Sequence, residues 1–130
     1  MICSIDLLPT VASSVGSKFK HKVDGIDLTP ALKGQKLNRE ALYWHYPHYS
    51  NQGGIPGGAI RMGDHKLFEN YENGKVSLYN LKEDIGESKD LSSDEPKRVK
   101  EMRNMLHAWY KEVDAKFLQP KGESTNPWRP

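Results

Sequence analysis

The sequence predicts an α+β fold in which a small, four-stranded antiparallel sheet is covered by one long C-terminal helix. Residues 41–81 alternate short apolar or aromatic segments with turn-forming pairs, a pattern typical of a β-meander. Residues 96–118 instead repeat apolar side chains at helical spacing. A chain of 130 residues with 36% hydrophobic residues can bury only a modest core, which suits one sheet under one helix.

The chain should open with a short helix. Ser4 or Asp6 can cap it, and Pro9 is tolerated only in its first turn. Gly16 is a typical residue to end it. A basic linker should follow, and then a single helical turn over residues 28–32.

Four strands are expected in the middle of the chain. The pairs Gly63-Asp64 and Asn73-Gly74 favour tight turns, and Asn73-Gly74 is the strongest hairpin signal present. Residues 51–58 hold four Gly and one Pro, so they are predicted to be irregular. The predicted strands are therefore 41–46, 59–62, 66–71 and 75–81.

The long helix should begin at Pro96, because proline suits the first helical turn, and should lie across one face of the meander. His107 is expected at the edge of its buried face. The apolar side chains that recur along it are Val99, Met102, Met105, Leu106, Trp109, Val113 and Phe117. Residues 119–130 contain three Pro and one Gly, and should form an extended tail.

Composition argues against several classes of function. Nineteen basic and 17 acidic residues are interspersed, with a net charge of +2 and no block of like charge. This indicates neither a nucleic-acid partner nor a polybasic membrane anchor. No apolar run is long enough to cross a membrane, and no signal peptide is visible. Cys3 is the only cysteine, which excludes an internal disulfide and any multi-cysteine zinc site.

Four short motifs, in order, resemble the C-terminal region of the sulfatase family, whose members are arylsulfatase-type enzymes of the alkaline-phosphatase superfamily. They resemble the family patterns S-x-D-L-x-P-T, DG-x-x-L-x-P-x-L-x-G, A-x-R-x-G-D-x-K-L and L-Y-N-L-x-x-D-x-x-E-x-x-D-L. In this chain they lie at 4–10, 24–34, 59–67 and 78–91. Most of these residues are turn or core positions, so the motifs identify the family better than they identify a site.

The resemblance implies that the whole chain, 1–130, is the C-terminal subdomain of an α/β enzyme that hydrolyses sulfate esters, on a carbohydrate. Residues 1–40 would be a junction helix and linker, and 41–81, 96–118 and 119–130 the meander, helix and tail. The partner would be an N-terminal catalytic domain outside this chain, which would carry calcium and a formylglycine nucleophile. Most family members are exported, so the resemblance implies a periplasmic or secreted protein.

No residue here can be assigned as catalytic. The family makes formylglycine within a C/S-x-P-x-R motif, but Cys3 is followed by Ser4-Ile5-Asp6-Leu7, without the proline and arginine. The calcium ligands and the catalytic His and Lys of the family also belong to segments upstream of those present. This chain alone is therefore expected to be inactive, with no metal site of its own.

Candidate substrate contacts are His45, His48, Asn51 and Arg61. Imidazole and amide groups can donate hydrogen bonds to sulfate or to sugar hydroxyls, and neighbouring tyrosines can stack on a sugar ring. The resemblance implies that loops of this region line the mouth of the pocket. Arg61 could clamp an anionic group with two parallel hydrogen bonds, or could form a structural salt bridge. His45 and His48 lack the acidic or cysteine partners of a metal site.

Two alternatives stay open at this point. The parent enzyme could be a related phosphodiesterase or phosphonate hydrolase, which only the upstream nucleophile motif would distinguish. The chain could also be a stand-alone binding or interaction module, in which case its apolar faces would have to close on each other.

Overall fold

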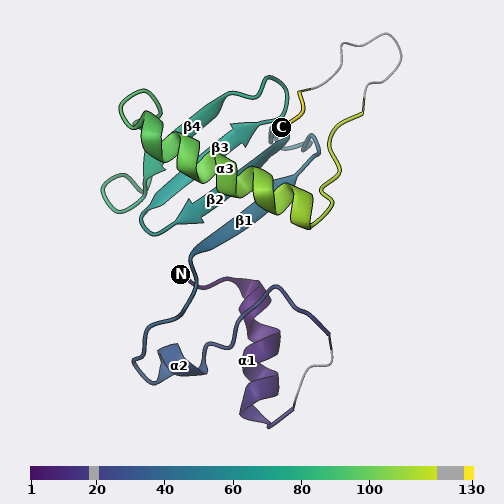
Figure 1. Ribbon diagram of the computed structural model, residues 1–130, viewed down its shortest axis with the longest axis vertical. Coiled ribbons are helices and arrows are strands. Elements are labelled where there is room, and N and C mark those ends of the chain that lie inside the picture. Colours follow the sequence, from purple (N-terminus) through teal and green to yellow (C-terminus); the bar gives the residue numbers. More distant parts are fainter. Residues whose placement is uncertain (18–20, 120–127) are drawn as a thin grey trace. The chain divides into compact units, whose positions relative to one another are not determined.

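The computed structural model describes residues 1–17, 21–119 and 128–130 (Figure 1). By their internal contacts, the residues divide into two compact units, 1–40 and 41–130. Each unit has buried groups of its own.

The first unit contains a 3₁₀ turn, Ser4–Asp6 (η1), followed by helix α1, Leu7–Ser14, and a short helix α2, Thr29–Leu32. Pro9 lies in the first turn of α1, as its missing N–H requires. Gly16 follows the helix with φ of +70°, a left-handed conformation that glycine adopts without strain. The predicted helix, its end and the later helical turn are therefore confirmed.

The first unit is held together around the buried carboxylate of Asp6. Its side chain is 0% exposed and forms a bidentate ion pair with Arg39, with N–O distances of 2.6 and 2.5 Å. It also accepts the backbone N–H groups of Cys3 and Ile26 at 2.8 and 3.0 Å. Asp6 thus joins three segments that are distant in sequence, which the sequence-based interpretation as a helix cap did not anticipate.

The second unit has a four-stranded antiparallel sheet in the order β1-β2-β3-β4, as predicted (Figure 1). Its strands are β1, Ala41–Tyr46, β2, Gly57–Met62, β3, His65–Asn70, and β4, Val76–Asn80. The first strand has the predicted bounds, and those of β3 and β4 differ from prediction by one residue at each end.

Strand β2 begins two residues earlier than predicted, because Gly57 and Gly58 belong to the sheet and not to the loop before it. They pair with Tyr46 and His45 of β1. A Cβ atom on Gly58 would lie 1.9 Å from the hydroxyl of Tyr110. Glycine here serves close packing of large side chains against a strand, a role that sequence alone does not separate from loop flexibility.

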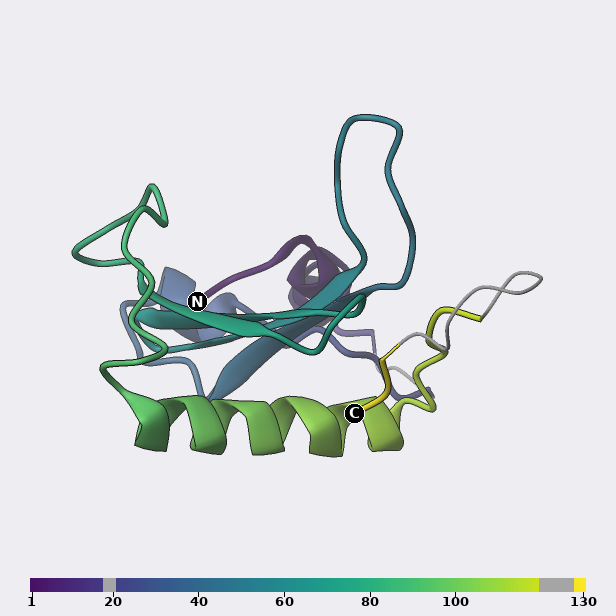
Figure 2. The ribbon, with the colours of Figure 1, turned by 90° about the horizontal axis from the view of Figure 1, so that it is seen from above.

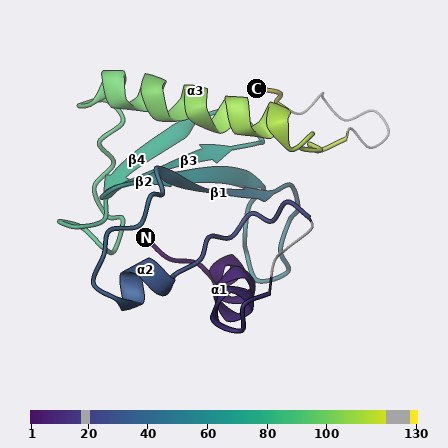
Figure 3. The same ribbon diagram turned by 60° about the horizontal axis from the view of Figure 1, so that its bottom comes forward.

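Helix α3, Pro96–Glu112, packs on one face of the sheet (Figures 2 and 3). Its start was predicted correctly, but it ends six residues before the predicted 118. Asp114 has φ of +50°, and the N–H of Ala115 bonds to the carbonyl of Tyr110 at 2.9 Å. The chain then turns back, and the ring of Phe117 packs 5.2 Å from that of Tyr110.

The hydrophobic core lies between α3 and the sheet. The residues that form it are Ile60, Leu67, Tyr71, Leu78, Met102, Leu106 and Tyr110. The opposite side of the sheet, which we call the open face, presents Leu42, Trp44, Ala59, Arg61, Lys66 and Phe68 at alternate positions of β1 to β3. Within the described part of the second unit, α3 covers only the core side (Figure 3).

The predicted extended tail falls mostly on residues 120–127, which lie outside the described residues. Trp128, beyond them, stacks on Tyr71 with a centroid distance of 6.2 Å. None of the described helices has the length and apolar character needed to span a lipid bilayer.

Candidate functional site

The most accessible candidate site is the loop between β1 and β2, residues 47–56. It rises from the sheet on the side opposite α3 (Figure 2). Both of its ends are fixed, because Tyr46 pairs with Gly57 in the sheet and the buried Pro56 accepts the N–H of Tyr71 at 3.0 Å. A loop that projects from fixed strand ends is the usual place for binding residues.

The tip of this loop is folded by its own hydrogen bonds. The N–H of Ser50 bonds to the carbonyl of Gly54 at 3.0 Å, and the N–H of Gly53 bonds back to the carbonyl of Ser50 at 3.1 Å. Gly53 has φ of +88°, which explains a glycine at this turn. Asn51 lies exposed within the turn, so its amide is presented on a defined backbone and not on a free chain.

Tyr49 ties the loop to the neighbouring β3–β4 turn. Its hydroxyl donates a hydrogen bond to Oε1 of Glu72 at 3.0 Å. This bond favours the protonated phenol, and so raises the pKa of Tyr49 above its ordinary value of 10.0. On the other side of the loop, the exposed ring of His48 contacts the ring of Tyr46 edge-on at 5.5 Å. His48 therefore contacts Tyr46, and the residue that follows it, Tyr49, is anchored.

His45 is placed differently from His48. It lies on the core side of β1, where Nε2 donates to the carbonyl of Lys116 at 2.8 Å and Nδ1 is 2.6 Å from the hydroxyl of Tyr71. The rings of Tyr71, Tyr110 and Phe117 surround it at centroid distances of 5.2 to 5.7 Å. Both ring nitrogens are thus engaged inside the unit, and burial raises the pKa values of Tyr71 and Tyr110.

Arg61 lies apart from the β1–β2 loop, on the open face. It pairs across the sheet with Leu42 and Lys66, at the end of β2 that is remote from the loop. There it borders a pocket of about 400 Å³, together with Trp44, Lys66, Phe68, Leu81 and Glu87. The structure therefore brings His48 and Asn51 together in one loop, but places His45 and Arg61 in two other environments.

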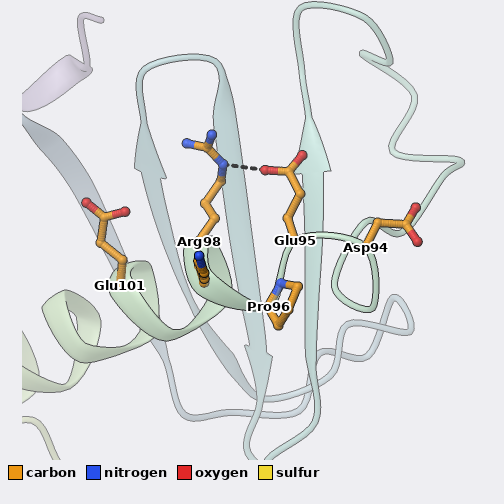
Figure 4. A pocket seen from close by; sticks show the side chains of 6 residues that line it. Asp94, Glu95, Pro96, Arg98 and Glu101 are labelled. Carbon is orange, nitrogen blue, oxygen red and sulfur yellow. Dashed lines mark hydrogen bonds and ion pairs between the residues drawn. The ribbon is translucent and has the colours of Figure 1, made fainter.

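A second hollow of about 430 Å³ lies at the start of α3, lined by Asp94, Glu95, Pro96, Lys97, Arg98 and Glu101 (Figure 4). Its charges are already paired in part, because Nε of Arg98 lies 2.5 Å from Glu95. The bond from Arg98 lowers the pKa of the Glu95 carboxyl. With mixed charge and no aromatic wall, this hollow offers little to a sugar ring.

The described residues contain no group of three or more His, Cys, Asp or Glu side chains that could hold a metal ion. Cys3, a free and half-buried thiol, belongs to the first unit.

Sequence reasoning did not find the pairing of Tyr49 with Glu72. The two residues are 23 positions apart, and nothing in their local sequence indicates that the two loops meet. The only available signal was indirect. In an antiparallel β1-β2-β3-β4 sheet, the β1–β2 and β3–β4 connections lie at the same end of the strands.

The chain is similar to the C-terminal regions of known sulfatases. A family profile described as "N-sulphoglucosamine sulphohydrolase, C-terminal" matches residues 1–116. A sulfatase of Formosa agariphila is 32% identical over 123 residues, which cover 82% of this chain and 22% of that protein. A Δ4,5-hexuronate-2-O-sulfatase of Bacteroides thetaiotaomicron is 33% identical over 97 residues, which cover 70% of this chain and 19% of that protein. The chain spans about a fifth of the length of these relatives.

Solved structures agree with the fold. One solved structure is described as a complex with its substrate, D-glucosamine-2-N,6-O-disulfate. The match covers 84% of this chain and 24% of the chain in that structure, with a TM-score of 0.72 and 25% sequence identity. A phosphonate monoester hydrolase of Agrobacterium radiobacter matches with a TM-score of 0.50 and 19% identity, over 85% of this chain and 23% of its own. The second match shows a shared fold alone.

Proposed function

The chain belongs to the family of N-sulphoglucosamine sulphohydrolase C-terminal regions, and we propose that it forms the C-terminal part of a sulfatase that hydrolyses sulfate esters on a carbohydrate. The observation that carries the proposal is the family match over residues 1–116, which includes the projecting β1–β2 loop. Relatives named for a hexuronate 2-O-sulfate and a sulfated glucosamine favour units of the glycosaminoglycan type as substrate.

In this proposal the β1–β2 loop lines the mouth of the substrate pocket. The imidazole of His48 and the amide of Asn51 are exposed and lie in a loop whose backbone is fixed. Both groups can donate hydrogen bonds to sulfate oxygens or sugar hydroxyls. A direct contact of His45 with substrate remains a prediction, and it would require the ring to exchange one of its two present bonds.

The chemistry itself would come from an N-terminal catalytic part, which would provide the formylglycine and bind the calcium, and without which this chain would be inactive. Helix α1 supports the existence of a larger core. Most of its large apolar side chains are exposed, among them Leu7, Leu8 and Val11 at 60 to 62%. A short helix with such a surface normally packs against further protein. By family resemblance, the enzyme would be periplasmic or secreted.

The two other hypotheses receive less support. The similarity to a phosphonate monoester hydrolase is at the level of fold, whereas the relatives at 32 and 33% identity are sulfatases. A stand-alone binding module would need to bury the apolar side chains of α1 within 130 residues, and Leu7, Leu8 and Val11 stay exposed.

The proposal is tested first in the coding sequence upstream of Met1. We expect an open frame that encodes a C/S-x-P-x-R motif and a cluster of Asp residues. The encoded protein should then release sulfate from sulfated glucosamine or from an unsaturated hexuronate 2-O-sulfate, while a variant without the motif's Cys or Ser should not. An upstream stop codon with no catalytic part nearby would refute the proposal, and hydrolysis of phosphonate esters only would favour the rival enzyme.

Replacing Tyr49 by phenylalanine is expected to raise the KM of that enzyme about 3- to 10-fold, because the loop loses one hydrogen bond. The kcat should change little. The phenol contacts Glu72 and not the reacting ester, so it acts by holding the loop that carries His48 and Asn51. Steady-state kinetics on a sulfated disaccharide measure the effect.

Glu72→Ala provides the matched control for this prediction. It removes the acceptor of the same hydrogen bond, so it should raise KM to a similar extent, and the double variant should be no worse than either single one. Additive losses would show that Tyr49 and Glu72 act separately, and would contradict the proposed anchor.

A further inference from the structure

A further hollow, of about 490 Å³, lies where helix α3 ends, and we call it the C-terminal hollow. Two cations and two aromatic residues stand out among those that line it, namely Lys111, Arg129, Tyr110 and Phe117. Its volume is that of a site for a small ligand. The hollow at the start of α3 has no aromatic wall, so the two differ in what they can bind.

The charge available in the C-terminal hollow is positive. Among the described residues that line it, Asp114 is the only acidic one, and its carboxylate is paired with Nζ of Lys116 at 2.5 Å. Lys111 is exposed and forms no ion pair with another described residue. Within the described part of the chain, the guanidinium of Arg129 bonds to backbone carbonyls, which carry no net charge. Lys111 and Arg129 are therefore both available to an anionic ligand.

Arg129 is held in place although it lies near the end of the chain. The ring of its neighbour Trp128 stacks on that of Tyr71 at 6.2 Å, and the guanidinium of Arg103 lies 5.7 Å from the Trp128 ring. A Cβ atom on Gly74 would collide with this indole, so the glycine leaves room for it. The cation is thus positioned by an anchored tryptophan and not by a free chain end.

The C-terminal hollow lies at the same end of the sheet as the β1–β2 loop. Nε2 of His45 donates to the carbonyl of Lys116, the residue before Phe117, at 2.8 Å. His45 is followed by Tyr46, the last residue of β1, after which the loop begins. Figure 2 shows the loop and the C-terminal end of α3 at this same end, on opposite sides of the sheet. A ligand that is long enough to pass around the end of the sheet can therefore touch both.

We propose that the C-terminal hollow is a second subsite for a sulfated polysaccharide, in which Lys111 and Arg129 bind a sulfate or carboxylate of a sugar unit remote from the hydrolysed one. This inference rests on the proposed function, which places the hydrolysed unit at the β1–β2 loop. Packed layers of a protein are about 10 Å apart, so one sugar unit cannot contact both places. A polymer carries anionic groups along its length, and the guanidinium of Arg129 suits such groups through two parallel bonds.

The test measures the binding of two ligands to the complete enzyme without the Cys or Ser of its C/S-x-P-x-R motif, by calorimetry. The ligands are a polymer of sulfated glucosamine and uronate units and a single sulfated glucosamine. Lys111→Gln and Arg129→Gln should each raise the Kd of the polymer about 2- to 5-fold, the usual effect of one solvent-accessible ion pair. The Kd of the single sugar should stay unchanged. In about 1 M salt the effect on the polymer should vanish, because the charges are screened.

Lys100→Gln is the matched control. Lys100 is also exposed, and it lies 11 residues before Lys111, about three turns and roughly 17 Å along the same side of α3. Its substitution removes the same charge outside the hollow, and should leave the Kd of the polymer unchanged. Lys111→Arg keeps the charge in the hollow, and should bind the polymer as the unsubstituted protein does.

Three results would overturn the proposal. An equal loss of polymer affinity in Lys100→Gln would mean that the polymer responds only to net charge. An equal loss of affinity for the single sugar would place Lys111 and Arg129 at the hydrolysed unit, and unchanged polymer affinity in both variants would leave the hollow without a saccharide. Failure of the native enzyme to hydrolyse sulfate esters would instead refute the proposed function, because the binding measurements need no turnover.

Discussion

Asp6→Ala is expected to destabilise the first unit by about 3 to 5 kcal/mol, the usual cost of removing one partner of a buried ion pair. Asp6 is completely buried and the side chain of Arg39 is only 6% exposed. The substitution would leave the guanidinium without its two bonds in a place where water cannot replace them. It would also free the backbone N–H groups of Cys3 and Ile26.

The effect should depend on pH in a defined direction. The hydrogen bonds from Arg39 are the main cause that holds the pKa of Asp6 well below its ordinary 3.8. Because folding lowers this pKa, the stabilisation by the Asp6 carboxylate is fully present above the pKa that the carboxyl has in the unfolded chain. It is lost as the pH falls through the pKa that the carboxyl has in the folded chain. The difference in the free energy of unfolding between Asp6→Ala and the native chain should thus be constant from about pH 5 to 8, and should shrink below about pH 4.

Amide hydrogen exchange at Ile26 and Leu28 measures this effect, because their N–H groups bond to Asp6 and to Thr10. Exchange there should accelerate by about 100-fold or more, as the expected loss of free energy requires. Removing both charges, as Asp6→Ala with Arg39→Met, should cost less than Asp6→Ala alone, since no unpaired cation is left buried. If the double variant is as unstable as the single one, the ion pair is not the source of the effect.

The elements with local signals were predictable from sequence. Turn pairs such as Gly63-Asp64 and the helical spacing after Pro96 depend on neighbouring residues, and both proved correct. The order of a meander follows from short connections, so the sheet topology could be predicted with them.

The predicted element boundaries that proved wrong depend on contacts between residues that are distant in sequence. The end of α3 at Glu112 is set by the packing of Phe117 on Tyr71 and Tyr110, and not by a helix-breaking residue in sequence. The start of β2 is set by the space that Gly58 leaves for Tyr110. Neither contact produces a periodicity that is recognisable in the sequence.

The family motifs have a physical explanation in the first unit. Thr10 donates to the carbonyl of Asp6 at 2.6 Å and accepts the N–H of Leu28 at 2.9 Å, so two motif segments are bonded to each other. Gly25 has no room for a Cβ atom, which would lie 2.0 Å from the carbonyl oxygen of Ile5. These residues were correctly interpreted as scaffold, but Arg39, which completes the arrangement, lies outside the motifs and was missed.

The placement of the candidate residues in the fold was predicted only in part. His48 and Asn51 lie together in a projecting loop, and the Gly and Pro content of residues 51–58 indicates such a loop from the sequence. His45, three residues before His48, lies on the core side of β1, opposite to its neighbour Trp44, because side chains alternate along a strand. Which face of β1 would meet α3 could not be decided from an aromatic-rich strand, since Tyr43, Trp44 and His45 are all suited to a core.

Glu69→Ala should destabilise the second unit by about 2 to 3 kcal/mol, less than the loss at Asp6 although Glu69 is also 0% exposed. Its carboxylate lies on the core side of β3, where it accepts from the Tyr110 hydroxyl at 3.5 Å and, more closely, from two partly exposed groups of α3, Nε of Arg103 at 2.7 Å and Nε2 of His107 at 2.9 Å. These partners are 35% and 24% exposed, so water can solvate them once the carboxylate is gone. Water cannot reach Arg39 in this way, because its side chain is only 6% exposed. The loss of stability is therefore larger for Asp6→Ala than for Glu69→Ala.

Denaturant unfolding followed by tryptophan fluorescence tests this prediction, because all three Trp residues lie in the second unit. Glu69→Gln should cost less than Glu69→Ala, since the amide oxygen can still accept from Arg103 or His107. Asp6→Ala should leave this fluorescence transition unchanged, which makes it the control from the other unit. A loss at Glu69 as large as that at Asp6 would mean that solvent access of the partner cation does not govern the cost of breaking these pairs.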